Sequence, residues 1–209
     1  MPITVRLTPK KLRRAEAHLR AADPVMADLI ARHGPCRLGK REGSPFESLA
    51  GAIIGQQLST KAAATIRGRV AALAGPRFEP AAILARSVEE LRTAGLSGAK
   101  TRYIRELSEK VVAGEFSFET VAGLDDEAAI TALTELSGIG RWTAEMFLLF
   151  HLQRADVLAL GDGGLQRAAQ QLYARRRNQA DVLAKAGEPW RPYRSVASWY
   201  LWRSLDNEG

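Results

Sequence analysis

Cysteine is almost absent from this chain of 209 residues, because Cys36 is its only one. A single cysteine excludes an intramolecular disulfide framework, a zinc site built from several cysteines and a four-cysteine iron–sulfur cluster. The three histidines leave few ligands for a metal hydrolase. Long apolar runs are lacking too: no segment approaches about 18 consecutive apolar residues, and the charged N-terminus has no apolar signal core. We therefore expect a cytoplasmic protein with no membrane contact.

Positive charge is in excess. The chain has 30 Lys and Arg against 23 Asp and Glu, which gives a formal net charge of +7 and a pI near 9.9. This balance suits an acidic partner such as nucleic acid, but charge alone does not identify one. Hydrophobic residues make up 46% and charged residues 25%, so the chain has the composition of a folded domain and not of a disordered one.

Strand patterns are also missing, since no run alternates with a period of two. Segments of helical periodicity follow one another with short Gly, Pro or Ser punctuation and without repeats or long linkers. Ser44-Pro45-Phe46-Glu47 resembles a capping box and predicts the start of a central, strongly apolar helix. We predict one all-α domain over 1–209. Later helices are predicted over 60–73, 80–85, 87–94, 100–113, 125–136, 141–152, 165–176, 180–186 and 192–205.

The most informative stretch is Leu133–Ala144, which reads LTELSGIGRWTA. We predict a helix that ends at Leu136, a Ser-Gly-Ile-Gly turn with Ile139 between the helices, and a second helix from Arg141. The glycines allow positive φ and close approach of another backbone, and the helix N-terminus can accept a phosphate oxygen. A Gly-x-Gly turn taken alone is more often an ordinary helix corner.

The string Leu-Ser-Gly-Ile-Gly-Arg-Trp-Thr-Ala resembles the helix-hairpin-helix motif of DNA repair proteins. Over most of its length the chain is similar to the 3-methyladenine DNA glycosylase II branch of the helix-hairpin-helix–Gly/Pro/Asp superfamily, without the N-terminal mixed α/β domain of longer members. The resemblance implies a two-lobed helical bundle, with the motif at about 125–152 and an active-site cleft between intertwined lobes. Four blocks carry it: residues 45–59, 138–144, 156–162 and 189–202.

Asp162 is the catalytic candidate. An Asp before Gly163-Gly164 is by chemistry alone most often a helix N-cap or turn former. The resemblance implies that the same carboxylate stabilises the positive charge that develops on the deoxyribose as the glycosidic bond breaks. Gly163 departs from the family, which commonly has an apolar residue there.

Trp142 occupies the position at which strand-nicking relatives carry a nucleophilic lysine, so the resemblance implies a monofunctional enzyme that leaves an abasic site. Trp142 and Trp199 are expected to stack on a flipped-out base, an arrangement that favours cationic alkylated bases. Both could instead be core residues. Met146, one turn after Trp142, is expected to give a wider, softer pocket.

The resemblance also implies how DNA is held. Gln57 would fill the space left by the flipped nucleotide, and Gln56, Leu58 and Ser59 would lie at the pocket rim or opposite strand; a solvated helix end is the alternative. Phosphate contacts are expected from Ser137, Gly138, Ile139, Gly140, Arg141 and Thr143. The carbonyls of Thr134, Leu136 and Ile139 could bind Na⁺ or K⁺ on DNA, and no cofactor is required. Further phosphate contacts are expected among Arg37, Lys40, Arg41, Lys61, Lys100, Arg102 and Arg167, with Arg175, Arg176 and Arg177 as weaker candidates.

The sequence thus predicts a monomeric DNA glycosylase that excises alkylated purines, such as 3-methyladenine and 7-methylguanine, from double-stranded DNA. A downstream abasic-site nuclease would take over the product, and in a bacterium the protein would associate with the nucleoid. Two alternatives stay open: a glycosylase of the same fold for deaminated or oxidised bases, and a non-catalytic module that binds damaged DNA. Asp162 separates them, because only an enzyme needs the carboxylate.

Overall fold

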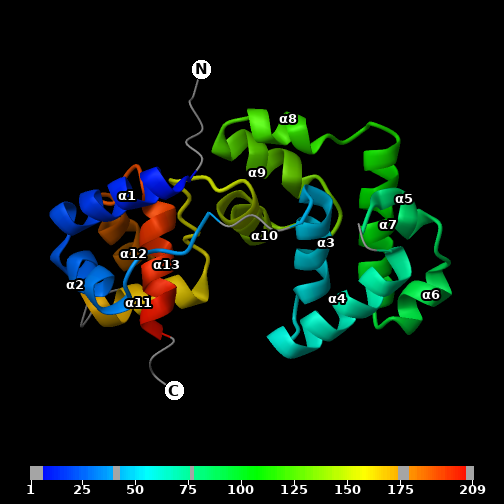
Figure 1. The fold of residues 1–209 in the computed structure, drawn as a ribbon, viewed down its shortest axis with the longest axis horizontal. Helices are drawn as coiled ribbons and strands as arrows, with labels where there is room; N and C mark the ends of the chain where they lie inside the picture. Colours follow the sequence, from blue (N-terminus) through cyan, green and yellow to red (C-terminus); the bar gives the residue numbers. More distant parts are fainter. Residues whose placement is uncertain (1–6, 40–42, 76–77, 174–178, 206–209) are drawn as a thin grey trace. The chain divides into compact units, whose positions relative to one another are not determined.

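The computed structural model describes residues 7–39, 43–75, 78–173 and 179–205. Every regular element within these ranges is a helix, which confirms the predicted all-α fold class (Figure 1). None of these helices is long and apolar enough to cross a membrane. The chain divides into two compact units: unit 1 joins residues 1–41 to residues 148–209, and unit 2 is the continuous segment 42–147. The single domain over 1–209 stays a prediction.

The described part of unit 1 is a helical bundle made from both ends of the chain. Helices α1 (Pro9–Ala22) and α2 (Pro24–His33) pack with α13 (Arg194–Leu205), which packs in turn on α11 (Gly163–Tyr173) and its neighbour α12 (Gln179–Gly187). The apolar faces of these helices meet in one core because each presents buried side chains at helical spacing. This core includes Leu19, Met26, Leu29, Ile30, Leu165, Val196, Tyr200 and Leu201.

Asp23 connects three segments of unit 1 through one buried carboxylate. Its Oδ1 caps α2 by accepting a hydrogen bond from the Val25 N–H at 2.8 Å. Its Oδ2 accepts from the Tyr173 hydroxyl at 2.7 Å and from the Trp190 indole N–H at 2.8 Å. Burial raises the pKa of Tyr173 far above its usual value, so the hydroxyl remains a donor. The N-cap residue of α2 therefore also holds Tyr173 and Trp190 in place.

The described part of unit 2 surrounds α3 (Pro45–Gly55), which packs against α4 (Thr60–Ala74) and α7 (Gly98–Val112). The short helices α5 (Pro80–Leu84) and α6 (Val88–Thr93) lie against α4 and α7. Helices α8 (Phe118–Gly123), α9 (Asp126–Thr134) and α10 (Arg141–Met146) follow in sequence, and α9 contacts both of the others. The core of unit 2 includes Phe46, Leu49, Ile53, Ile54, Ile83, Leu91, Ile104 and Leu133.

The start of α3 agrees with the sequence analysis. Ser44 Oγ accepts a hydrogen bond from the Glu47 N–H at 3.1 Å, and Pro45 occupies the first helical position. This is one half of the predicted capping box. The reciprocal pair of hydrogen bonds occurs at α6, between Ser87 and Glu90. Local capping chemistry therefore fixed the first residue of α3, and with it the register of the central helix.

Two features of the helices differ from the prediction. Helix α8 was not predicted; it begins after Ser117, whose side chain accepts from the Thr120 N–H. The helix predicted over 141–152 stays α-helical only to Met146 and continues as a π-helical segment, Phe147–His151. The division between the two units falls inside this segment. Its apolar periodicity resembles that of an α-helix, so the sequence pattern could not reveal the wider turn.

Candidate DNA interface and active site

The predicted hairpin is present in unit 2. Helix α9 ends at Thr134, two residues earlier than predicted, and α10 begins at Arg141 as predicted. In the intervening turn the Ile139 N–H donates to the Leu136 carbonyl at 3.1 Å. The Ile139 side chain is buried, in line with the prediction that it packs inside the hairpin. The turn is thus a defined structure that presents its neighbouring glycines at the surface of unit 2.

The two hairpin glycines have different roles. Gly138 has a φ of 81°, and a Cβ there would overlap the aromatic ring of Tyr103 on α7. Gly140 is the N-cap of α10 with a φ of −93°, which any residue adopts, and a Cβ there would meet nothing within 4 Å. Gly138 is therefore required by the fold of unit 2. The fold of unit 2 does not require a glycine at position 140. The absence of a side chain there leaves open space where another backbone could approach.

The remaining hairpin residues, all predicted to contact phosphate, differ from one another in exposure and in hydrogen-bond partners. Ser137 is exposed, whereas Thr143 is buried, so only the backbone of Thr143 could serve a phosphate. Arg141 forms a two-bonded ion pair with Glu127, at 2.6 and 2.9 Å, and its Nε donates to Glu145 at 3.0 Å. These partners raise the pKa of Arg141, while the hydrogen bonds from Arg141 lower the pKa of Glu127. These contacts use three of the five N–H donors of the guanidinium, so Glu127 competes with a phosphate for Arg141.

The second predicted DNA element is the wedge turn, defined as Gln56–Ser59. Gln56 is the C-cap of α3, and Gln57 has a left-handed φ of 57° with an exposed side chain. Leu58 is 39% exposed, high for a leucine. Ser59 Oγ accepts from the Ala62 N–H and caps α4, a role that the sequence analysis did not assign. Gln57 and Leu58 are therefore the projecting side chains of this turn.

Gln56 and Lys100 do not have the surroundings expected of DNA-contacting side chains. The Gln56 side-chain amide donates to the Gly138 carbonyl at 2.8 Å, so the wedge turn is bonded to the hairpin. Lys100 Nζ donates to the carbonyls of Ile54 and Gln56 at 2.8 and 2.7 Å. Lys100 lies there because the last carbonyls of α3 have no N–H partners within the helix, and the ammonium supplies them. A contact of Lys100 with a phosphate stays a prediction, because the ammonium has a third N–H.

Asp162 in unit 1 caps a helix, and its role in catalysis stays a prediction. Its Oδ1 accepts from the Leu165 N–H at 2.8 Å and caps α11. The same oxygen accepts from the Trp202 indole N–H at 3.0 Å. Asp162 is 8% exposed, so its carboxylate lies in a shielded setting where charge interacts strongly. A Cβ on Gly164 would come within 3.1 Å of this Oδ1 and 3.2 Å of Trp202, which explains a glycine there.

The sequence analysis missed Trp202 and Phe150. Phe150 is 47% exposed, and its ring stacks on Trp202 with a centroid distance of 5.7 Å. Trp199, the predicted pocket residue, instead lies edge-to-face against Tyr200 and within 5.8 Å of the Arg203 guanidinium. Trp199 and Trp202 are three residues apart in α13, so their side chains lie next to each other on one face of the helix. The available signal was the aromatic-rich string 199–202, from which the hydrogen-bonding partner of Asp162 could not be selected.

Trp142 and Met146 lie on α10 in unit 2. Trp142 is 49% exposed, which is unusual for a tryptophan. Met146 is half-buried one turn later. The predicted site residues thus divide between the units: unit 2 carries the hairpin, the wedge turn, Trp142 and Met146, and unit 1 carries Asp162 and Trp199.

Other basic candidates are only partly described. Arg37, Lys61 and Arg167 are exposed, and Arg102 is exposed and 3.8 Å from Glu106. Lys40, Arg41, Arg175, Arg176 and Arg177 lie outside the described residues. Among the described residues, no group of three or more His, Cys, Asp or Glu side chains could hold a metal ion. Carbonyl oxygens such as those of Thr134, Leu136 and Ile139 are the donors that monovalent cations take, and the Leu136 oxygen already accepts one hydrogen bond.

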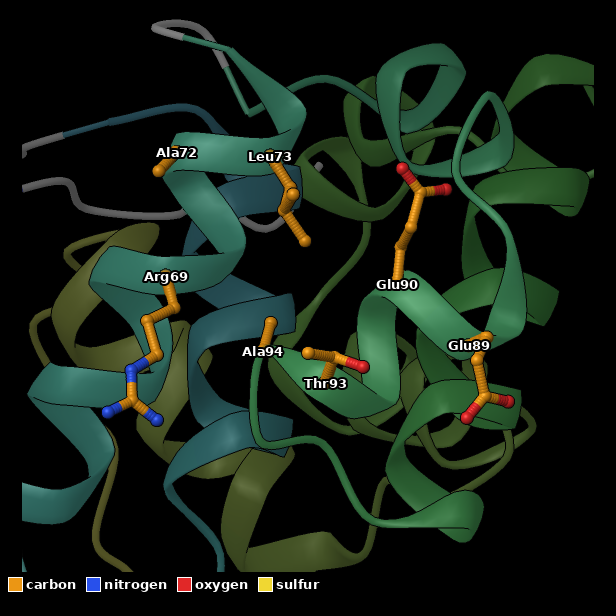
Figure 2. A pocket seen from close by; sticks show the side chains of 7 residues that line it. All are labelled: Arg69, Ala72, Leu73, Glu89, Glu90, Thr93 and Ala94. Atoms are coloured by element: carbon orange, nitrogen blue, oxygen red, sulfur yellow. The ribbon is translucent and has the colours of Figure 1, made fainter.

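Two cavities of unit 2 are lined by neither Trp142 nor Met146. Figure 2 shows one of about 450 Å³ between α4 and α6, with Leu73 and Ala94 toward its middle. None of the predicted site residues lines it. A second cavity, of about 560 Å³, adjoins the wedge turn through Gly55 and Leu58 and extends between α3 and α4 to Arg67.

Comparison with known proteins shows the family to which the chain belongs. Residues 50–192 match the HhH-GPD superfamily of base excision DNA repair proteins, and the chain belongs to that family. The alkylbase DNA glycosidase-like protein mag2 of Schizosaccharomyces pombe is 30% identical over 197 residues, with 91% of this chain and 92% of that protein covered.

Two solved structures are also similar. The DNA-3-methyladenine glycosidase of Bacillus halodurans matches with a TM-score of 0.84 and 39% identity, covering 92% of this chain and 89% of that one. The 3-methyladenine DNA glycosylase of Schizosaccharomyces pombe, solved in complex with abasic DNA, matches with a TM-score of 0.81 and 31% identity, covering 92% and 97%.

Proposed function

We propose that this protein is a monofunctional DNA glycosylase that flips out alkylated purines and hydrolyses their N-glycosidic bond, leaving an abasic site. The observation that carries the proposal is Asp162, a shielded carboxylate held by the Leu165 N–H and the Trp202 indole. Two donors to one oxygen fix the carboxylate before reaction, and a fixed negative charge attracts a sugar cation more strongly as that cation develops. The names of the relatives support the alkylated-base substrate.

The absence of strand cleavage follows from Trp142. A lyase needs an amine at the reacting sugar carbon to form a Schiff base, and an indole cannot supply one. The half-exposed Trp142 instead suits stacking on a base, most strongly on one made cationic by methylation. From the family resemblance, Met146 and Trp199 are the other expected base-pocket residues, and Asp162 would act on the sugar.

Binding to DNA would rest on the hairpin and the wedge turn. Backbone groups from Ser137 to Arg141 would take phosphate oxygens, with Gly140 giving the space for close approach. The carbonyls of Thr134, Leu136 and Ile139 would hold a Na⁺ or K⁺ ion, which would draw a phosphate to the turn. Gln57 would enter the duplex, with Leu58 beside it. Double-stranded DNA with a damaged base is thus the partner, and no further cofactor is needed.

The product defines the next step. Hydrolysis of the glycosidic bond leaves an intact strand with a hemiacetal sugar and no base, so an abasic-site nuclease would have to follow. We propose that this monomer transfers its product to such a nuclease, and that it acts in the compartment that holds the chromosome: the cytoplasm, on the nucleoid, in a bacterial cell.

A panel of duplex oligonucleotides tests the proposal, with one damaged base in each: 3-methyladenine, 7-methylguanine, hypoxanthine, uracil or 8-oxoguanine. We expect excision of the two methylated purines, with strand breaks only after alkali. Excision confined to hypoxanthine, uracil or 8-oxoguanine would support the alternative glycosylase. Tight binding to damaged duplex without any excision would support a non-catalytic module. Borohydride trapping of a protein–DNA adduct would contradict the monofunctional assignment.

A further inference from the structure

We infer that Lys100 and Gln56 are positioning residues that join the wedge turn and the hairpin of unit 2 into one rigid DNA-binding element. This inference rests on the proposed function, because it assigns to these residues the placement of Gln57 in the duplex. Neither residue needs to touch DNA for the role.

The first link is the ammonium of Lys100 at the end of α3. Its Nζ donates to the carbonyls of Ile54 and Gln56, at 2.8 and 2.7 Å. These carbonyls lie where the dipole of α3 is negative and where the helix has no further N–H groups, so a cation is the most favourable donor. Partial burial lowers the pKa of Lys100 from its usual value, because it disfavours the charged ammonium. The backbone directly before Gln57 is thereby fixed.

The second link is the Gln56 side chain. While its carbonyl accepts from Lys100, its Nε2 donates to the Gly138 carbonyl at 2.8 Å, across 82 positions of sequence. Gly138 also lies so close to Tyr103 that no Cβ fits between them. Lys100 and Tyr103 are both on α7. The contacts therefore close a ring from α7 to the wedge turn, from there to the hairpin, and back to α7.

A closed ring matters because the two DNA elements must act together. The hairpin sets the position of the phosphates, and Gln57 must enter the base stack at a fixed distance from them. Gln57 has a left-handed backbone, which is uncommon for a residue with a side chain and must be held by its surroundings. A misplacement of about 1 Å at such a site can cost roughly 100-fold in rate.

Three roles for Lys100 give different measurable results. If it only stabilises α3, its loss lowers the melting temperature and leaves excision at saturating enzyme unchanged. If it binds phosphate, its loss weakens binding to every duplex and reduces the slope of log Kobs against log salt by about 0.9. If it positions the wedge turn, excision slows while the salt slope stays as in the unmodified protein.

The experiment compares K100M with K110M, which removes the same charge from an exposed site on the same helix. Single-turnover excision of 7-methylguanine is measured at saturating enzyme, together with the salt slope on undamaged duplex. A second readout is the fluorescence of 2-aminopurine next to an abasic-site analogue, which reports insertion of the wedge without any chemistry. We expect K100M to slow excision by about 10- to 100-fold and to lose most of the fluorescence change, and K110M to do neither.

Rescue and folding are controlled by two further variants. K100R retains donors for the two carbonyls and should recover part of the rate. Q56M keeps the backbone contact with Lys100 but removes the bond to Gly138, and it should also slow excision. If K100M fails to fold, Q56M decides the question: excision by Q56M at the rate of the unmodified protein would overturn the inference.

The same measurements separate this inference from the proposed function. If the unmodified protein excises nothing, the glycosylase proposal fails, while the 2-aminopurine comparison still tests the coupling. If the unmodified protein excises 7-methylguanine and folded K100M matches it, the coupling fails and the glycosylase proposal stands. A slope that falls by about 0.9 in K100M assigns Lys100 to a phosphate and also overturns the coupling.

Discussion

The indole N–H of Trp202 donates a hydrogen bond to Oδ1 of Asp162 at 3.0 Å, and this oxygen also caps α11. The cap alone would hold the carboxylate at the start of the helix. The second donor, from 40 positions further along the chain, fixes its rotation. Both contacts lie within unit 1, so the orientation of Asp162 is set by the fold itself and not by substrate.

The first prediction concerns the charge of Asp162. D162N keeps an oxygen to cap α11 and removes the negative charge, so we expect normal folding and binding. Excision should fall by roughly 10²–10³-fold, the usual effect of losing one preorganised electrostatic group. The measurement is single-turnover excision of 3-methyladenine at saturating enzyme. The matched control is D125N, which changes the N-cap of α9 in the same way and should leave the rate unaltered. A D162N protein that excises at the normal rate would remove Asp162 from catalysis.

The second prediction compares two tryptophans of α13. W202F keeps an aromatic ring but removes the donor to Asp162, and we expect excision to slow roughly tenfold, as for loss of a hydrogen bond to a charged group. W199F keeps an aromatic ring at position 199, and no hydrogen bond from Trp199 to Asp162 is described. The excision rate of W199F should therefore change less than that of W202F. Equal effects of the two substitutions would contradict the positioning role of Trp202.

The third prediction uses the two hairpin glycines. G138V must displace Tyr103 and adopt a positive φ, so it should lower the melting temperature strongly. G140V has room for its side chain and an ordinary φ, so it should melt like the unmodified protein. G140V should nevertheless weaken binding to every duplex, whether damaged or not. Normal DNA binding by folded G140V would exclude Gly140 from the interface.

The fourth prediction concerns the pair of Arg141 with Glu127. E127Q removes the strongest partner of the guanidinium and frees it for a phosphate. We expect tighter binding and a salt slope steeper by about 0.9, which corresponds to one additional phosphate contact. E89Q removes an equivalent charge from exposed α6 and serves as the control. An E127Q slope equal to that of E89Q would mean that Arg141 does not reach DNA.

The fifth prediction concerns Cys36. Burial raises the pKa of this thiol to about 12, so almost no thiolate exists at pH 8. Alkylation by iodoacetamide should therefore be very slow in the native protein and fast in denaturant. Because the pKa of Cys36 is higher in the folded than in the unfolded protein, the neutral thiol contributes stability to the folded state at neutral pH. This stability is lost as the pH rises through the pKa of the folded protein. Rapid labelling under native conditions would show that the segment around Cys36 opens.

Local signals in the sequence were enough for the fold class and for the positions of the candidate DNA-binding elements. Ser44 and Pro45 fixed the start of α3, and the Ser-Gly-Ile-Gly string fixed the start of α10, because capping and turn formation depend on adjacent residues. The contacts that local signals did not indicate join partners far apart in sequence. Lys100, for example, donates to the end of α3 from 44 to 46 positions away.

Trp202 and Arg141 show the same limit. Trp199 and Trp202 share a helix face, and no spacing rule could select the one that reaches Asp162. The guanidinium of Arg141 lies beside a predicted phosphate site, yet Glu127 on the preceding helix neutralises it. Residue type and spacing predicted where the candidate elements lie, whereas the direction of each polar side chain was decided by tertiary contacts.

The insertion of one unit into the other has a consequence for biosynthesis. Unit 2 is continuous and can fold as soon as residue 147 has left the ribosome. Helices α1 and α2 are made before unit 2, whereas α13, which packs on both of them, begins only at Arg194. At ordinary translation rates the early helices wait on the order of 10 s for this partner. During this time the apolar surface that α13 later covers is exposed to contact with other apolar surfaces.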